Sequence, residues 1–276
     1  MKVLLFWLMF IFSSVYVEAA ESELHIGKFS NGDLTGWKEQ TTGIMKPKTV
    51  YSLSKDKDND RTILIAHSTK SASGKIYKLN LDPQKYPVIK WSWKIDHIIK
   101  KGNEKLKEGD DFAVRVYVVF PRGFFSKTRA ICYVWANKLP KGAHVVSPFT
   151  TNIITVAEDS GDELAGRWTF HNRNVYEDYK NFFGEEPPKV GAIALMTDSD
   201  NTGELAVGYY GDIFLLRSTD NVTPLPSSKP DELKHNEQKS SRVMTQKEQK
   251  QKDQGNKEQP GKVMPALPPS TAPSSP

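Results

Sequence analysis

Residues 111–120 alternate between apolar and polar side chains so regularly that both faces of one strand can be assigned from the sequence alone. Successive side chains of a strand point to opposite sides of its sheet. The apolar face would hold Phe112, Val114, Val116, Val118 and Phe120. The other face would hold Asp111, Arg115 and Tyr117. The pattern therefore predicts a strand whose sheet is buried on one side and open to solvent or a ligand on the other.

Strand patterns recur through the central part of the chain, where turn residues such as Gly, Pro, Asn and Asp separate them. We predict strands over residues 62–67, 75–81, 88–95, 111–120, 129–137, 152–157, 167–172, 190–197 and 205–216. Many short strands at this spacing are typical of an all-β fold. The predicted architecture is a two-sheet antiparallel β-sandwich of the jelly-roll, or galactose-binding-like, kind.

One segment has the period of a helix instead. Val175, Tyr179 and Phe182 fall on one side of a helix over residues 175–183. Asn174 is suited to cap its first turn and Gly184 to end it. We predict a single short helix that closes one end of the sandwich.

The beginning of the chain has the pattern of a secretory signal peptide over residues 1–19. Met1-Lys2 precedes an apolar run over residues 3–12, and cleavage after Ala19 puts small side chains at the two positions that signal peptidase reads. An uncleaved membrane anchor is the alternative. Because no second long apolar segment follows, we expect a secreted or periplasmic protein without stable membrane insertion after cleavage.

Composition divides the rest of the chain into a domain and a tail. Residues 20–217 have a length that suits one β-sandwich domain. Residues 218–276 contain no Phe, Trp or Tyr and are rich in Lys, Gln, Pro and Ser. Such a segment buries too little apolar surface to offset the entropy of ordering, so we predict a disordered tail. It would act as a spacer or as a dispensable solvated end.

Charge and cysteine content exclude several classes of protein. The net charge is +5, but the 38 basic and 33 acidic residues are interleaved, which argues against a nucleic-acid partner. Cys132 is the only cysteine, so an intramolecular disulfide is impossible, and its apolar neighbours predict a buried, inert thiol. The motifs of P-loop enzymes, serine hydrolases and zinc proteases are missing.

The strand predicted over residues 129–137 also has two distinct faces. One face is made of small residues, and the other holds Arg129, Ile131, Tyr133, Trp135 and Asn137. Consecutive strands are usually neighbours in a sheet, so we expect this strand to pair with residues 111–120. One sheet face would then display Arg115, Tyr117, Arg129, Tyr133, Trp135 and Asn137 together.

Aromatic rings beside guanidinium and amide groups form a surface that suits a saccharide. A ring packs against the C–H face of a sugar, and fixed polar groups bind its hydroxyls. Arg115 and Arg129 would also favour an acidic sugar, because a guanidinium holds a carboxylate through two parallel hydrogen bonds. The alternative is an ordinary core, in which Tyr133 and Trp135 pack between the sheets and each arginine pairs with an aspartate.

Other polar residues are expected to line the same site: Asp111, Arg173, Asn174, Asp198, Asp200, Asn201, Tyr210 and Asp212. We predict no cofactor. The loop over residues 198–204 is similar to the start of a calcium-binding loop, but Tyr209 stands where such a loop has a bidentate glutamate. A plain hairpin turn and a structural calcium near Asp198 and Asp200 are therefore both open interpretations.

Two parts of the sequence resemble known families. Residues 29–37 are similar to the segment that leads into the first strand of secreted jelly-roll carbohydrate-binding modules. The motifs WSWKID, GDDF, YVW, RNVYEDY, MTDSDNTG and YGDI resemble a bacterial family known as domain of unknown function 3047. This second likeness covers most of residues 29–217. It implies a secreted or periplasmic bacterial protein, and it brings no activity and no functional residue with it.

These features lead to one main hypothesis and two alternatives. The main hypothesis is a non-catalytic module that binds a saccharide or another small polar ligand on the predicted Arg/Tyr/Trp face. One alternative is a polysaccharide lyase or glycosidase in which Arg115, Tyr117 and a carboxylate from Asp111 or Asp198 transfer protons. The other alternative is a structural or assembly protein of the bacterial envelope.

Overall fold

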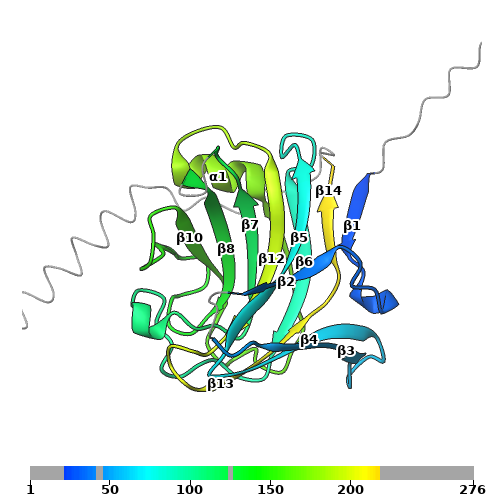
Figure 1. The fold of residues 1–276 in the computed structure, drawn as a ribbon, viewed down its shortest axis with the longest axis vertical. Coiled ribbons are helices and arrows are strands. Elements are labelled where there is room, and N and C mark those ends of the chain that lie inside the picture. The colour runs from blue at the N-terminus through cyan, green and yellow to red at the C-terminus, as the bar shows by residue number, and fades with distance from the viewer. Residues whose placement is uncertain (1–21, 42–45, 124–126, 218–276) are drawn as a thin grey trace, which may run out of the picture. The chain divides into compact units, whose positions relative to one another are not determined.

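A computed structural model describes residues 22–41, 46–123 and 127–217 (Figure 1). The predicted signal peptide, residues 1–19, and the predicted disordered tail, residues 218–276, lie outside the described residues. In the described ranges, no helix is both long enough and apolar enough to cross a membrane.

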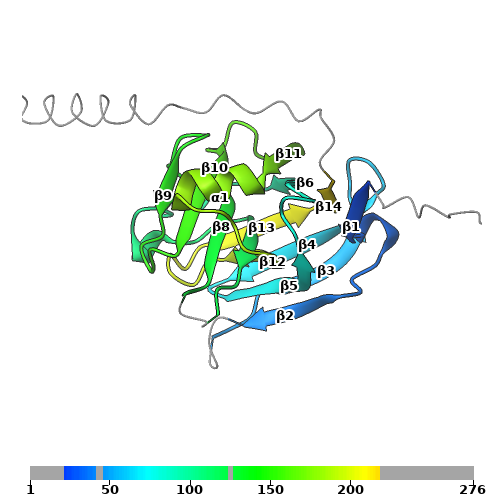
Figure 2. The ribbon, with the colours of Figure 1, turned by 90° about the horizontal axis from the view of Figure 1, so that it is seen from above.

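The described strands form two sheets (Figures 1 and 2). The first sheet has the order β1 (Glu23–Gly27), β14 (Ile213–Leu216), β6 (Val88–Ile95), β13 (Leu205–Tyr210), β4 (Thr62–Thr69) and β3 (Val50–Lys55). A further strand of this sheet, β11 (Thr169–Asn174), pairs with β6. The second sheet has the order β2 (Trp37–Thr41), β5 (Ala72–Leu81), β12 (Val190–Asp198), β7 (Arg115–Phe120), β8 (Arg129–Ala136), β10 (Ile153–Ser160) and β9 (His144–Val146).

The predicted fold class is confirmed, because the described part is an almost entirely β, two-sheet sandwich of the jelly-roll kind with one α-helix. The strands β1, β2, β3 and β9 were not predicted, and further details differ as well. The pairing of β8 with β10 is parallel, so the second sheet is mixed. The segment predicted as one strand over residues 205–216 is divided at Gly211, whose N–H donates to the Ser92 carbonyl at 2.9 Å. A Cβ at Gly211 would lie 2.2 Å from the Ser92 hydroxyl, so this close approach requires glycine.

The helix lies where it was predicted, as α1 (Val175–Phe183). The side chain of Asn174 accepts a hydrogen bond from the Glu177 N–H at 3.1 Å, and Gly184 ends the helix in the left-handed conformation with φ of 68°. Tyr179 packs on Phe120 at the end of β7, with ring centroids 4.6 Å apart. The helix therefore closes one end of the sandwich (Figure 1).

The register between β7 and β8 overturns the predicted common face. The strands do pair, but Arg115 lies opposite Val134, Tyr117 opposite Cys132, and Val116 opposite Tyr133. Directly opposed residues share one side of a sheet. Arg115 and Tyr117 are therefore on the outer side, whereas Tyr133 and Trp135 point into the core between the sheets. Alternation assigns the residues of each strand to two faces. A shift of one residue in the pairing of two strands changes which of these faces lie on the same side of the sheet, and the alternation alone does not reveal that register.

The first part of the predicted strand over residues 111–120 is irregular, and this moves Phe112 to the other side. β7 begins only at Arg115, and Phe112 packs in a second apolar cluster with Cys132, Val134 and Ala136. Val114 and Val116 lie in the main core as predicted. Cys132 is buried, and its burial raises the pKa of the thiol to about 12, which agrees with an inert residue.

Trp135 is 1% exposed, and its indole N–H donates to the Gly161 carbonyl at 2.9 Å. We expect Trp135→Ala to lower the free energy of unfolding by about 3–5 kcal/mol, because truncation leaves a cavity in the core. Urea denaturation followed by circular dichroism measures this loss. Phe170→Ala is the matched control, since Phe170 is 70% exposed and should cost no more than about 0.5 kcal/mol. Equal losses in the two variants would contradict the assignment of Trp135 to the core.

Candidate functional site

Two hollows of the described surface are large enough for a small ligand. One, of about 590 Å³, lies between β1 and β5 and is lined by aliphatic side chains such as Leu24, Leu79 and Leu81 and by polar ones such as Lys28 and Lys78. The other, of about 330 Å³, has three exposed or half-buried aromatic residues in its lining, Trp168, Phe170 and Phe214, together with the buried Trp91. We call this second hollow the aromatic groove. Its polar lining residues are Glu23, Ser30, Arg61, Thr62, Lys90, Ser92, His171 and Asp212.

Strand register places the aromatic groove on the outer face of the first sheet. Phe170 on β11 lies opposite Ser92 on β6, and Phe214 on β14 lies opposite Lys90 on β6. Ser92 and Lys90 are two residues apart, so these four side chains share one face. Trp93 lies on the other face of β6, in the core. The fold therefore keeps the aromatic rings of β11 and β14 outside while the tryptophan beside them is buried.

Two rings of the aromatic groove are held in place by neighbouring side chains. The Trp168 indole N–H donates to the buried carboxylate of Asp56 at 2.6 Å. Phe214 stacks on the His25 ring with centroids 4.2 Å apart. Phe170 is 70% exposed, so most of its surface is available for contact. Two rings held in place and one exposed ring give a preorganised apolar surface for a flat ligand.

Sequence reasoning missed all three rings of the groove. The strand over residues 167–172 was predicted, but the alternation in it was not used to assign its faces. That alternation puts Trp168 and Phe170 on one side and His171 on the other. Two large aromatic residues on one face of an edge strand were the signal that could have identified the groove.

Among the residues predicted for the site, only Asp212 lines the aromatic groove. Its carboxylate accepts hydrogen bonds from the Ser30 N–H at 2.8 Å and the Ser30 hydroxyl at 2.5 Å. The His25 Nε2 atom lies 3.2 Å from the same carboxylate. Asp212 thus joins the segment before β14 to η1 (Phe29–Asn31) at the rim of the groove.

Arg115 is the first residue of β7 in the second sheet and belongs to a buried ion pair. Its Nε donates to the Asp198 carboxylate at 3.0 Å, a second guanidinium nitrogen contacts the same group, and another donates to Asp110 at 3.3 Å. Tyr117 accepts from the guanidinium at 3.1 Å. Although burial alone would lower the pKa of Arg115, the Asp198 carboxylate raises it well above its ordinary value. These groups satisfy one another inside the protein.

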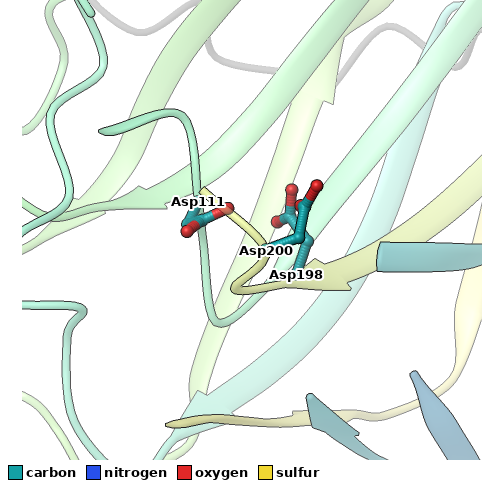
Figure 3. A group of neighbouring side chains, drawn as sticks. All are labelled: Asp111, Asp198 and Asp200. Atoms are coloured by element: carbon teal, nitrogen blue, oxygen red, sulfur yellow. The ribbon is translucent and has the colours of Figure 1, made fainter. Parts of the chain in front are cut away.

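Three aspartates in this region could form a cation site. Oxygens of Asp111, Asp198 and Asp200 all lie within 4.8 Å of one another (Figure 3). However, Asp198 is paired with Arg115, Asp200 binds Lys46 Nζ at 2.5 Å, and Asp111 accepts from the Thr202 N–H at 2.6 Å. The side chain of Asn201 donates to Asp111 at 3.1 Å as well. Carboxylates suit calcium, but protein cations already compensate Asp198 and Asp200, and the structural calcium stays a prediction.

The predicted residues near α1 contact the helix and its ends rather than a ligand. Arg173 donates to Asp178 through two nitrogens, at 2.9 and 2.5 Å, and Tyr133 donates to the same carboxylate at 2.6 Å. Arg129 binds Glu185 at 2.6 Å, and its guanidinium lies 4.6 Å from the centroid of the Phe183 ring. These contacts attach the helix to β8 and β11.

The remaining predicted residues make buried structural contacts. Asn137 accepts from the Ile99 N–H and donates to the Asp111 carbonyl, both at 2.8 Å. The Tyr210 hydroxyl donates to the Met196 carbonyl at 2.7 Å. With Tyr133 and Trp135 in the core, this agrees with the alternative of an ordinary core, except that Arg129 pairs with a glutamate and not with an aspartate.

A buried network that sequence reasoning also missed lies beneath β11. The Asp159 carboxylate on β10 accepts hydrogen bonds from the Trp93 indole at 2.8 Å and the Thr169 hydroxyl at 2.7 Å. His171 Nε2 lies 2.8 Å from it, and Lys141 Nζ lies 3.0 Å from its second oxygen. Asp159 belongs to the second sheet, whereas Trp93, Thr169 and His171 belong to the first. The network therefore fastens the strand that carries Phe170 to the opposite sheet.

A family model described as Protein of unknown function (DUF3047) matches residues 35–214. No curated protein matches the sequence.

Solved structures with a similar arrangement share little sequence with this chain. One is the family 11 carbohydrate-binding module of the cellulosomal cellulase Lic26A-Cel5E of Clostridium thermocellum, with 12% identity and a TM-score of 0.39 over 74% of this chain and 100% of that chain. Another is the Caldicellulosiruptor saccharolyticus module CBM27-1 in complex with mannohexaose, with 9% identity and a TM-score of 0.37 over 71% and 98% of the two chains. A third is tailspike protein 4 of bacteriophage CBA120, with 12% identity and a TM-score of 0.38 over 69% and 21%.

The Asp159–His171 pair makes the stability of the protein depend on pH. Although burial opposes both charges, Asp159 and Glu158 raise the pKa of His171, and His171, Trp93 and Thr169 lower the pKa of Asp159. A raised histidine pKa stabilises the fold below about pH 6.5, and the contribution is lost as pH rises through the folded-state pKa. A lowered aspartate pKa stabilises it above about pH 4, and that contribution is lost as pH falls.

We therefore expect the melting temperature to be highest between about pH 4 and pH 6.5. His171→Gln should remove the decrease above pH 6.5 and also reduce the acid-side contribution, because His171 is one of the groups that lower the pKa of Asp159. Calorimetric scans from pH 3 to pH 9 measure both limbs. The control is His67→Gln, because His67 is exposed on β4. An unaltered decrease in His171→Gln would show that other groups cause it.

Proposed function

The chain belongs to the DUF3047 family of proteins of unknown function, and from its own surface we propose that it is a non-catalytic module that binds a saccharide in the aromatic groove. The observation that carries the proposal is the set of three aromatic rings, Trp168, Phe170 and Phe214, around one open hollow. Sugar rings have apolar C–H faces that pack on aromatic rings.

Polar groups around the rings complete the requirements for a saccharide. Ser92, Lys90 and Asp212 lie between and beside the rings and offer donors and acceptors to hydroxyl groups. The volume of about 330 Å³ falls at the lower end of the range for small-ligand sites. The groove is open along the sheet, so we infer that it holds one or two sugar units of a longer chain.

In the enzyme alternative, the two carboxylates predicted to transfer protons cannot reach a substrate. Asp111 and Asp198 are buried, and their oxygens hold Thr202, Asn201 and Arg115. A general acid or base must come within hydrogen-bonding distance of the proton that it transfers. The groups at these positions support the fold and not proton transfer, which favours the binding module.

Substitution of the groove rings tests this proposal. We expect Trp168→Ala and Phe170→Ala each to weaken binding of an oligosaccharide by at least about tenfold, because truncating an aromatic anchor typically costs about 2 kcal/mol or more. A glycan array on the purified chain identifies a binder, and isothermal titration calorimetry measures the change. Phe149→Ala is the control, because Phe149 is 55% exposed but lies outside the groove. The proposal fails if no glycan binds, or if all three variants bind like the parent chain.

We also propose that the protein is exported, on the basis of its N-terminal sequence. The apolar run over residues 3–12 and the small residues before Ala20 support removal of residues 1–19 by signal peptidase. When the full chain is expressed in a Gram-negative host, N-terminal sequencing of the periplasmic fraction should find a mature protein that begins at Ala20. Ala19→Asp should block cleavage, because the peptidase requires a small residue there. A cytoplasmic product that keeps Met1 would contradict export.

A further inference from the structure

The aromatic groove contains two cationic side chains that no described residue neutralises. Arg61 and Lys90 both line it, and neither forms an ion pair within the described ranges. We propose that the ligand of the groove is an acidic saccharide, one that carries a carboxylate such as a uronic acid. This inference rests on the proposed function, because it names the chemical class of ligand for the same site.

Lys90 lies on the outer face of β6, between residues of two neighbouring strands. Phe214 is opposite it on β14, and Asn172 is opposite it on β11. Its side chain is exposed. An ammonium group beside an aromatic ring and an amide is suited to bind a carboxylate while the sugar ring rests on Phe214.

Arg61 also lines the groove, immediately before β4. Its backbone is fixed, because its carbonyl accepts from the Asp56 N–H at 2.7 Å and its own N–H donates to the Asn59 side chain at 3.1 Å. The guanidinium stays available, and a guanidinium binds a carboxylate through two parallel hydrogen bonds. An anionic sugar in the groove would meet two cations of the lining.

Lys94, a third cation on the same sheet face, is neutralised by carboxylates. Lys94 is buried, and its Nζ lies 2.8 Å from Asp56 and 2.6 Å from Asp58. The same Asp56 also holds the Trp168 indole. The fold therefore supplies carboxylates to the buried lysine of this face and none to the exposed Arg61 and Lys90.

The carboxylates of the groove do not pair with these two cations. Asp212 accepts hydrogen bonds from Ser30 and lies beside His25. Glu23 is exposed in the lining and has no described ion-pair partner. Arg61 and Lys90 therefore stay available to an anionic group of a ligand.

The test compares two oligosaccharides on the whole chain by isothermal titration calorimetry: a hexamer of neutral hexoses and a hexamer of uronic acids. We expect the uronic acid hexamer to bind at least about tenfold more tightly, because each hydrogen bond to a charged group contributes about 1.5–3 kcal/mol. The double variant Arg61→Gln, Lys90→Gln should remove this advantage, so that the two hexamers bind it with equal affinity. Lys85→Gln is the matched control, because Lys85 is exposed and does not line the groove.

The outcomes separate this inference from the proposed function. Equal affinity for the two hexamers would overturn the acidic ligand and leave saccharide binding standing. Uronic acid binding that survives the double variant but is lost in Phe170→Ala would likewise overturn the role of the two cations. If neither hexamer binds and the glycan array is also negative, the proposed function itself fails. Raising the salt concentration gives a further readout, since it should weaken only the binding of the uronic acid hexamer.

Discussion

The candidate site depends on the contacts that the buried carboxylate of Asp159 makes with the opposite sheet. This carboxylate lies in the second sheet and accepts from Trp93 and Thr169 in the first, with the His171 ring 2.8 Å away. Because a buried carboxylate is costly without such partners, these groups can be satisfied in only one alignment of the two sheets. Thr169 and His171 face inward in that alignment. The side chains between and beside them, Trp168 and Phe170, are therefore held outside.

The charged groups of the protein fall into two kinds that have different consequences. Arg115, Arg129 and Arg173 are each paired with carboxylates at element ends, where they join β7 to β12 and α1 to its neighbouring strands. Such pairs are satisfied within the protein, and removing one partner would leave a buried charge unpaired. Arg61 and Lys90 are the opposite case, since they are exposed beside aromatic rings and have no described partner. Unpaired cations beside exposed rings suit recognition better than stability.

Much of the fold was predictable, while the candidate site was not. The helix bounds of Val175 and Phe183, its Asn174 cap and most strand positions follow from local patterns of side chains. The predicted site failed because it needed the register between two strands, and that register places Tyr133 beside Val116 rather than beside Arg115 or Tyr117. Asp212 was the one predicted residue that lines the groove.

The sequence by itself determined most of the strands, where the helix begins and ends, and that a single buried cysteine forms no intramolecular disulfide. These properties depend on side chains a few positions apart, so short segments of sequence are enough to predict them. Only the tertiary structure decided that Tyr133 and Trp135 on β8 face the core, which cations are neutralised, and that Trp168, Phe170 and Phe214 meet around one hollow. Those outcomes depend on register and on the packing of residues far apart in the chain, because a shift of one residue between strands exchanges the buried face for the exposed one.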